Sequence, residues 1–555
     1  MTLNASRFHT LALATTVIAA ALAMRPSAAA PKFFVDDPIA VDRPTQDATQ
    51  VKPAEVKLFV DLAYNIARGF SVPAPGRAAN VNTVDEVPDS AWYTNRLGWQ
   101  AIAPRDMAIG PDTSNGPAAG RWMVTSSKSD GVTPGFTIKD ANGDRWFLKF
   151  DPPGYRGMAT GTEVAVTKLM WALGYNVPEN HIAYLHRKQL AVAAEATFTP
   201  AGGTKRALRT GDIDRLLQKA DREANGSYRV VASRALAGKP VGRIRFSGVR
   251  PDDPNDVVPH EDRRELRGYG VFAAWLNHVD AKAINSLDTL VTEGGRSYVR
   301  HHLIDFGSAL GSGGVGPADY WAGQEYLVEP QLAAKQMVTF GLSPAGWRTE
   351  AFYQSRAIGR IPADNTSFNP DLWKPRVPNQ AFLHARADDK FWAARKLAAM
   401  TTELIAAAVH AGDFGDPAAE AFLVHALAQR RDAIERAYFT AVNPIADVTI
   451  DEEQLTFTNV AVDADVARAP QLYRAVWSTF DNATRATRRV AETSSRSTSI
   501  DVPRGLPAAD GAFIQVAVSA VDAAQPAWSI PVHAYFRLRN GAWRLVGFER
   551  MPAQE

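Results

Sequence analysis

The chain has 555 residues, more than one ordinary domain needs, so two or three domains are expected. Hydrophobic residues make up 46% and charged residues 22%, which is typical of a globular protein. The net charge of +2 excludes the strongly basic character of many nucleic-acid-binding proteins, so no nucleic-acid partner is expected.

Residues 1–29 have the pattern of a secretory signal peptide. Arg7 and His9 precede an apolar stretch over residues 11–24, and small residues follow at 27–30. An uncleaved anchor helix is the alternative, but the stretch is short for crossing a bilayer. The chain has no cysteine, which excludes disulfides and a lipid-modified cysteine. A periplasmic or secreted protein is expected, with no transmembrane segment in the mature chain.

Residues 30–120 are rich in Pro, Asn, Asp and Gly and predict an N-terminal extension. Apolar residues recur near helical spacing between Pro53 and Arg68, which predicts one helix there. The aromatic pair Trp92-Tyr93 indicates that the extension packs against the rest of the protein.

Around residues 121–150 the apolar residues alternate, and two further strands are expected at 181–186 and 189–198, which predicts a β-rich region over about 121–200. Residues 136–139 and 145–150 predict a hairpin, because Asn142-Gly143 supplies its turn. A helix is expected from Thr162 to Leu173, with Gly174 ending it.

Residues 200–260 are charged and interrupted by Gly and Pro, and are interpreted as an insertion with some strand character at 228–231 and 242–246. Helical spacing returns at 261–279 and again at 388–438, whereas 308–378 predicts little regular structure. Alternating β-branched residues after residue 440 predict an antiparallel β domain over 441–555, an accessory domain of unknown partner.

The residues that indicate chemistry follow the helix at 261–279. Asp280, Lys282 and Asn285 lie close together in the segment 277–285, and Asp305-Phe306-Gly307 comes after an apolar stretch about twenty residues later. Phosphoryl transfer needs a carboxylate for the acceptor hydroxyl, oxygen ligands for a divalent cation, and cations for the phosphates. This set of side chains supplies all three.

The pattern His-x-Asp-x-Lys-x-x-Asn followed by Asp-Phe-Gly resembles the catalytic and metal-binding loops of the protein-kinase-like superfamily. The divergent branch of phosphatidylinositol kinases, HipA-type kinases and secretory-pathway kinases is most similar. The resemblance implies an α+β fold with a bilobal core over residues 121–440. Its β-rich N-lobe would span about 121–200 and its helical C-lobe about 261–440.

The resemblance also implies a role for each matching position. The implied roles are catalytic base for Asp280, phosphate contact for Lys282, metal ligands for Asn285 and Asp305, nucleotide-phosphate lysine for Lys149, its ion-pair partner for Glu163, and phosphate-covering loop for Gly131 and Gly135.

Several elements have simpler interpretations or depart from the family pattern. Glu163 also fits a capping box begun by Thr160, and Lys149 alone fits a surface lysine. Asp413-Phe414-Gly415 repeats the tripeptide between two predicted helices and is interpreted as a turn. The loop at 127–135 lacks Gly-x-Gly-x-x-Gly, and no Ala-Pro-Glu follows residue 308.

The sequence therefore predicts an exported phosphotransferase that uses ATP with Mg²⁺ or Mn²⁺. Its phosphate acceptor is left open among a lipid, a protein hydroxyl and a small molecule. The alternatives are a catalytically inactive nucleotide-binding or scaffolding pseudokinase of the cell envelope, and a nucleotidyl transferase on the same fold.

Overall fold

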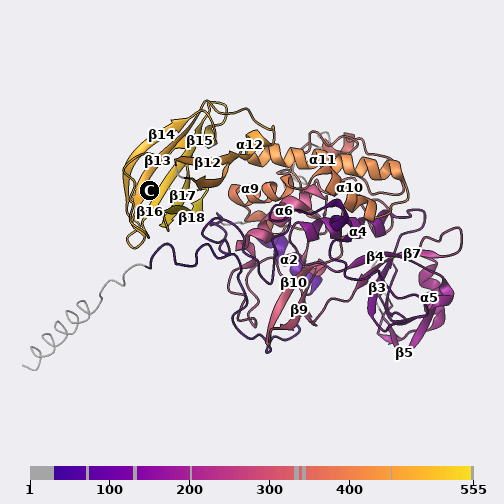
Figure 1. The fold of residues 1–555 in the computed structure, drawn as a ribbon. Helices are drawn as coiled ribbons and strands as arrows, with labels where there is room; N and C mark the ends of the chain where they lie inside the picture. The colour runs from indigo at the N-terminus through magenta and orange to yellow at the C-terminus, as the bar shows by residue number, and fades with distance from the viewer. Residues whose placement is uncertain are drawn as a thin grey trace, which may run out of the picture.

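The computed structural model describes residues 30–69, 74–128, 134–200, 203–329, 337–339, 346–451 and 453–551. The predicted signal peptide and Gly131 lie outside these residues. The described chain is an α+β protein with ten α-helices and four β-sheets, which confirms the mixed fold class. Within the same residues, no helix is both long enough and apolar enough to cross a membrane. Figure 1 shows a lobe with a β-sheet, a helical centre and a C-terminal β domain.

The first lobe contains a seven-stranded sheet in the order β4-β7-β3-β2-β1-β5-β6. The predicted hairpin is confirmed: β2 and β3 pair antiparallel, with Gly135 opposite Lys149. The strands are β1 (Trp122–Lys128), β2 (Gly135–Lys139), β3 (Arg145–Phe150), β4 (Asn180–Leu185), β5 (Leu190–Phe198), β6 (Arg206–Ala207) and β7 (Tyr228–Arg234).

The sequence indicated that the segment 200–260 is an insertion, but the structure places part of it inside the first sheet. Its strand β7 lies inside the sheet and pairs with both β3 and β4. One face of β7 packs in an apolar cluster with α5 (Thr210–Leu217), and α4 (Met158–Ala172) contacts the strand as well. Because β7 is covered on both faces, its sequence does not alternate between apolar and polar residues, and the period-two signal is absent.

Helix α4 begins four residues before the predicted start at Thr162. The Asp151 carboxylate, which follows β3, accepts hydrogen bonds from the backbone amides of Gly157, Ala159 and Thr160. These amides belong to the unsatisfied first turn of the helix, so a side chain from outside the helix caps it.

The helical centre packs around α6 (Arg264–Trp275), which contacts α8, α9 and α11. Asp416 caps α11, whose first residue is Pro417, a pattern typical of helix starts. The remaining helices are α2 (Leu58–Gly69), α3 (Pro104–Ile109), α8 (Gln380–Leu383), α9 (Ala387–Ala398), α10 (Thr402–Ala411), α11 (Pro417–Phe439) and α12 (Val460–Asp463). A three-stranded sheet has the order β10-β9-β8, with β8 (Lys239–Gly242), β9 (Ser286–Glu293) and β10 (Arg296–Leu303).

The C-terminal region is an antiparallel β domain, as predicted. Its core is continuous with that of the helical centre, and Trp477 and Trp528 are fully buried in it. Its two sheets have the orders β14-β13-β16-β17-β18 and β11-β12-β15. The strands are β11 (Ile445–Ile450), β12 (Gln454–Asn459), β13 (Leu472–Phe480), β14 (Thr487–Ser495), β15 (Ser499–Asp501), β16 (Phe513–Val521), β17 (Val532–Arg539) and β18 (Ala542–Glu549).

A buried group of charges connects α6 to its neighbours. Arg264 and Arg267, both fully buried on α6, pair with opposite oxygens of Asp389 on α9 at 3.0 Å. Arg264 also pairs with Asp85 of the N-terminal extension at 3.0 Å. Buried charges are tolerated only when they are paired, so these contacts hold three segments in one arrangement.

We expect Asp389→Ala to lower the free energy of unfolding by about 3–5 kcal/mol, because it leaves two buried guanidinium groups without a shared carboxylate. Chemical denaturation measures this loss. Asp432→Ala is the control, because the Asp432 side chain is 46% exposed and solvent screens its ion pair with Arg431, so a loss below about 1 kcal/mol is expected there. Equal losses in the two variants would contradict the role given to the buried pair.

Candidate active site

Lys149 stands at the centre of the candidate site. Its Nζ lies 2.8 Å from Glu163 Oε2 on α4 and 2.8 Å from Asp305 Oδ1. Burial alone would lower the pKa of Lys149, but the carboxylates of Asp305 and Glu163 outweigh it and raise that pKa. Lys149 therefore keeps its positive charge at neutral pH. The Lys149 and Asp305 side chains remain 35% and 44% exposed, so a ligand can reach both.

Glu163 holds the Asp-Phe-Gly segment as well as the lysine. Its side chain is 1% exposed, and its two oxygens accept hydrogen bonds from the backbone amides of Phe306 (3.0 Å) and Gly307 (2.9 Å). The capping-box interpretation does not apply, because α4 begins at Met158 and the Thr160 hydroxyl donates to Asp151 instead.

The second group of predicted residues lies in the loop after α6. Asn285 Nδ2 donates to Asp280 Oδ2 at 2.8 Å and also to the Asp280 backbone carbonyl. Lys282 Nζ lies 2.6 Å from the other carboxylate oxygen of Asp280. The loop thus presents one carboxylate between an amide and an ammonium group.

The hairpin β9–β10 brings the two groups together. Asn285 directly precedes β9, and Asp305 follows β10 by two residues. Ser286 pairs with Leu303 at the base of the hairpin, and the amide of Ile304 donates to the Asn285 carbonyl at 3.1 Å. The two predicted metal ligands are therefore neighbours in space, although twenty residues separate them in sequence.

The donor set fits a hard divalent cation. The NH₂ group of Asn285 donates a hydrogen bond to Asp280, so Oδ1 of Asn285 is the amide atom that can bind a cation. Asp305 contributes a carboxylate. No cluster of three or more His, Cys, Asp or Glu suited to a metal occurs in the described part of the chain. Mg²⁺ is commonly bound by one or two protein oxygens together with substrate phosphates and water, which these residues match.

His278, the first residue of the predicted motif, is a buried packing residue. Burial, helped by Lys282, lowers its pKa to about 4 despite the nearby carboxylates of Asp280 and Asp305. Its ring lies 5.5 Å from the ring of fully buried Phe306. His278 is thus neutral at pH 7 and packs the loop against the Asp-Phe-Gly segment.

The predicted phosphate-covering loop is described only in part. Gly131 lies outside the described residues, and Gly135 is the first residue of β2, where its carbonyl accepts a hydrogen bond from Ser127 Oγ. The repeated tripeptide at 413–415 is a turn between α10 and α11, as expected, and its Asp413 pairs with Arg229 at 2.8 Å.

Sequence reasoning did not consider Arg243, which contacts the first residue of the β9–β10 hairpin. Burial lowers the pKa of Arg243, while the carboxylates of Asp305 and Asp288 act in the opposite direction. Its Nη1 donates to the Ser286 carbonyl at 2.5 Å. A single arginine in a charged segment carries no sequence signal, and only packing places it here.

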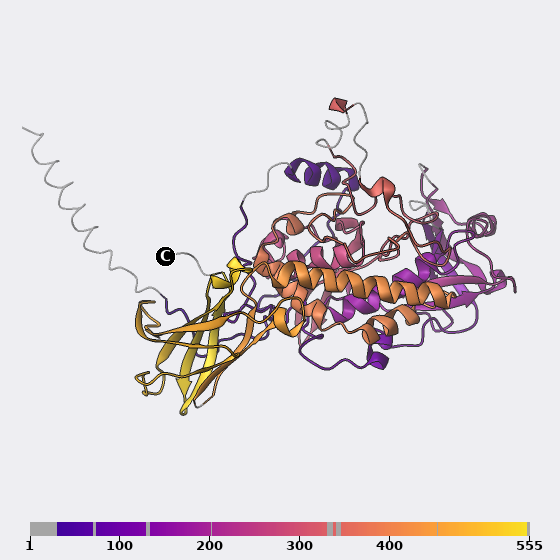
Figure 2. The ribbon, with the colours of Figure 1, turned by 90° about the horizontal axis from the view of Figure 1, so that it is seen from above.

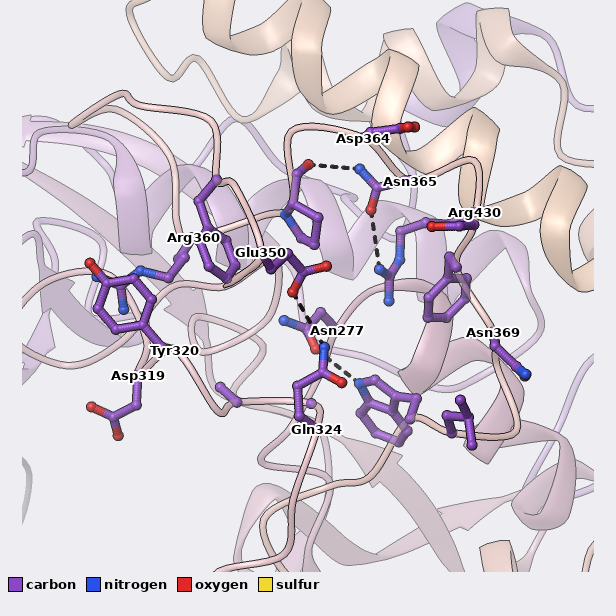
Figure 3. A pocket seen from close by; sticks show the side chains of 18 residues that line it. Asn277, Asp319, Tyr320, Gln324, Glu350, Arg360, Asp364, Asn365, Asn369 and Arg430 are labelled. Atoms are coloured by element: carbon purple, nitrogen blue, oxygen red, sulfur yellow. Dashed lines mark hydrogen bonds between the residues drawn. The ribbon is translucent and has the colours of Figure 1, made fainter. Parts of the chain in front are cut away.

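A polar cavity of about 180 Å³ lies next to the start of the candidate loop. Trp373 Nε1 donates to Asn277 Oδ1 at 2.9 Å in its wall, and Glu350 points toward Gln324 across it (Figure 3). Buried Arg430 closes one side and donates to the α6 carbonyls of Ala274 and Trp275. Most of the lining comes from the irregular segment 308–378.

No family model, curated protein or solved structure matches this chain.

We expect stability to fall as the pH drops from about 6.5 to about 4. The unfolded state binds a proton at His278 in this range while the folded state does not, so the free energy of unfolding decreases with falling pH. His278→Gln should reduce that slope by up to about 1.4 kcal/mol per pH unit. Denaturant titrations at several pH values measure it. His425→Gln, at an exposed position on α11, should leave the slope unchanged.

Proposed function

We propose that this protein is an exported phosphotransferase that uses ATP with Mg²⁺ or Mn²⁺ and has a bilobal protein-kinase-like core over residues 121–440. The observation that carries the proposal is the position of Lys149, 2.8 Å from both Glu163 and Asp305. Catalysis in protein kinases has two requirements. A lysine on a strand must pair with a glutamate on a helix, and the aspartate of Asp-Phe-Gly must be in place to bind the metal.

The arrangement around this lysine supports the same proposal. Lys149 lies on β3, Glu163 on the next helix, and Asp305 directly after the strand that follows the candidate loop. Three segments far apart in sequence thus meet at one ammonium group. A surface lysine needs no such neighbours, so the simpler interpretation of Lys149 is less favoured.

Each side chain then has a chemical task in the proposed reaction. The oxygen of the acceptor hydroxyl bonds to the γ-phosphorus, and ADP leaves. Asp280 accepts the proton that this hydroxyl loses. Lys149 and Lys282 place positive charge on the phosphates. Asn285 and Asp305 would hold the divalent cation, which supplies further charge for the phosphate oxygens.

We expect ATP with Mg²⁺ or Mn²⁺ to raise the thermal midpoint of the protein. A ligand at a hundred times its dissociation constant contributes about 2.7 kcal/mol to stability. Asp305→Ala should abolish the metal-dependent increase. Asp501→Ala is the control, because Asp501 is exposed on β15 in the C-terminal β domain, and it should retain the increase. A folded protein with no increase for any nucleotide and metal would contradict a nucleotide site.

We expect Asp280→Asn to retain the nucleotide-dependent midpoint and to lower turnover by about 10²–10⁴-fold, because it removes the proton acceptor but not the phosphate contacts. Hydrolysis of ATP, with water as the acceptor, measures turnover. ADP as the product supports phosphoryl transfer, whereas AMP and pyrophosphate would indicate nucleotidyl transfer. Wild-type protein that binds ATP but shows no turnover would support the inactive scaffold.

A further inference from the structure

Helix α2 turns an apolar face toward the solvent. Phe59 is 81% exposed and Val60 65% exposed, and Tyr64 one turn later is also exposed. Ala63 and Ala67 complete this outward face, which contains no charged residue. Figure 2 shows α2 at the outer edge of the molecule.

The polar residues of α2 face the protein instead. Asp61 and Asn65 are half-buried, together with Leu62 and Ile66, and Asn65 Nδ2 donates to the Asp61 carbonyl. Burial raises the pKa of Asp61, opposed by the charge of Arg245. An ordinary surface helix buries its apolar residues and exposes its charges, so the outward face of α2 indicates a partner surface.

Basic side chains stand at both ends of this face. Exposed Lys57 directly precedes the helix. In its last turn, Arg68 Nη1 donates to the Tyr64 hydroxyl at 2.9 Å, and its guanidinium carbon lies 5.5 Å from the ring centre. An apolar centre flanked by tyrosine and cations matches a helix that lies in the interface of an anionic membrane.

The helix also lies beside the segment that borders the candidate site. A side chain at Gly69 would approach Pro378 to 3.1 Å, and the next residue, Asn379, donates from Nδ2 to the Ala281 carbonyl at 3.3 Å. The same segment bonds back to the loop through Arg376, whose amide donates to the Val279 carbonyl at 2.8 Å.

A second exposed apolar pair borders this segment. The Leu327 amide donates to the Arg376 carbonyl at 2.7 Å, and both Leu327 and Val328 have exposed side chains. Apolar side chains therefore flank the segment 376–379 on two sides, next to the candidate catalytic loop.

We propose that the outward face of α2 seats the protein on an anionic lipid surface. The occupant is a bilayer interface, into which Phe59 and Val60 insert while Lys57 and Arg68 contact the headgroups. The charge of these cations selects an anionic membrane over an uncharged apolar partner. This proposal does not depend on the proposed phosphotransferase activity.

The proposal is tested by co-sedimentation of the predicted mature chain, which begins at Ala30 and lacks the apolar signal stretch, with vesicles. The vesicles are made of phosphatidylcholine alone or of phosphatidylcholine mixed with phosphatidylglycerol. Wild-type protein should bind the anionic vesicles, and Phe59→Ser/Val60→Ser should weaken binding about tenfold or more, because two inserted side chains are lost. Val257→Ser is the matched control, since Val257 is 75% exposed on a loop elsewhere, and it should bind like wild type.

A charge variant separates the two parts of the proposal. Lys57→Gln should weaken binding to anionic vesicles about fivefold and leave binding to phosphatidylcholine unchanged, because a basic residue near such a surface contributes about that factor. Added salt should reduce the difference. An equal effect on both vesicle types would contradict the electrostatic contribution.

Two results would overturn the proposal. One is wild-type protein that binds neither vesicle type. The other is a dimer, detected by light scattering, that Phe59→Ser/Val60→Ser dissociates, because a second copy would then cover the face. The nucleotide-dependent rise in thermal midpoint should persist in every α2 variant, so failure of membrane docking is distinguishable from failure of the nucleotide site.

Discussion

The geometry of the candidate site depends on the buried carboxylate of Glu163. A carboxylate that is 1% exposed must have its oxygens satisfied, and Glu163 achieves this with Lys149 and with the backbone amides of Phe306 and Gly307. These partners come from β3 and from the segment after β10, so one side chain on α4 ties three parts of the fold together. Asp305 reaches Lys149 because the two residues that follow it are held in this way.

Other buried charges keep that support in place by the same principle. Asp151 caps α4 from outside the helix, and Arg229 on β7 donates to Thr160 and pairs with Asp413 in the turn after α10. The first lobe is thereby joined to the C-terminal helices next to the helix that carries Glu163. Arg264 and Asp389 act similarly between α6 and α9. At each junction, the penalty for burying an unpaired charge favours a single arrangement of the segments.

Part of this structure could be predicted from sequence, namely the parts with a local signal. The Asn142-Gly143 turn and alternating residues indicated the hairpin that carries Lys149, and the structure confirms that hairpin. The resemblance to the protein-kinase-like superfamily implied metal ligands at Asn285 and Asp305, and the structure places Asn285 beside the segment that leads to Asp305. The place of β7 inside the sheet was not predicted, because a strand covered on both faces does not alternate, and the true start of α4 was not predicted because its cap, Asp151, lies outside the helix.

The sequence by itself determined the elements whose signals span a few residues: the hairpin turn, the spacing of apolar residues on α6 and the alternating strands of the C-terminal domain. Only the tertiary structure decided that Arg243 contacts Ser286, that Asn285 lies beside the segment after β10, and that α2 turns Phe59 outward and Asp61 inward. Periodicity and turn chemistry act between near neighbours in the chain. The distance between residues 149, 163 and 305 is instead set by packing and by the pairing of buried charges.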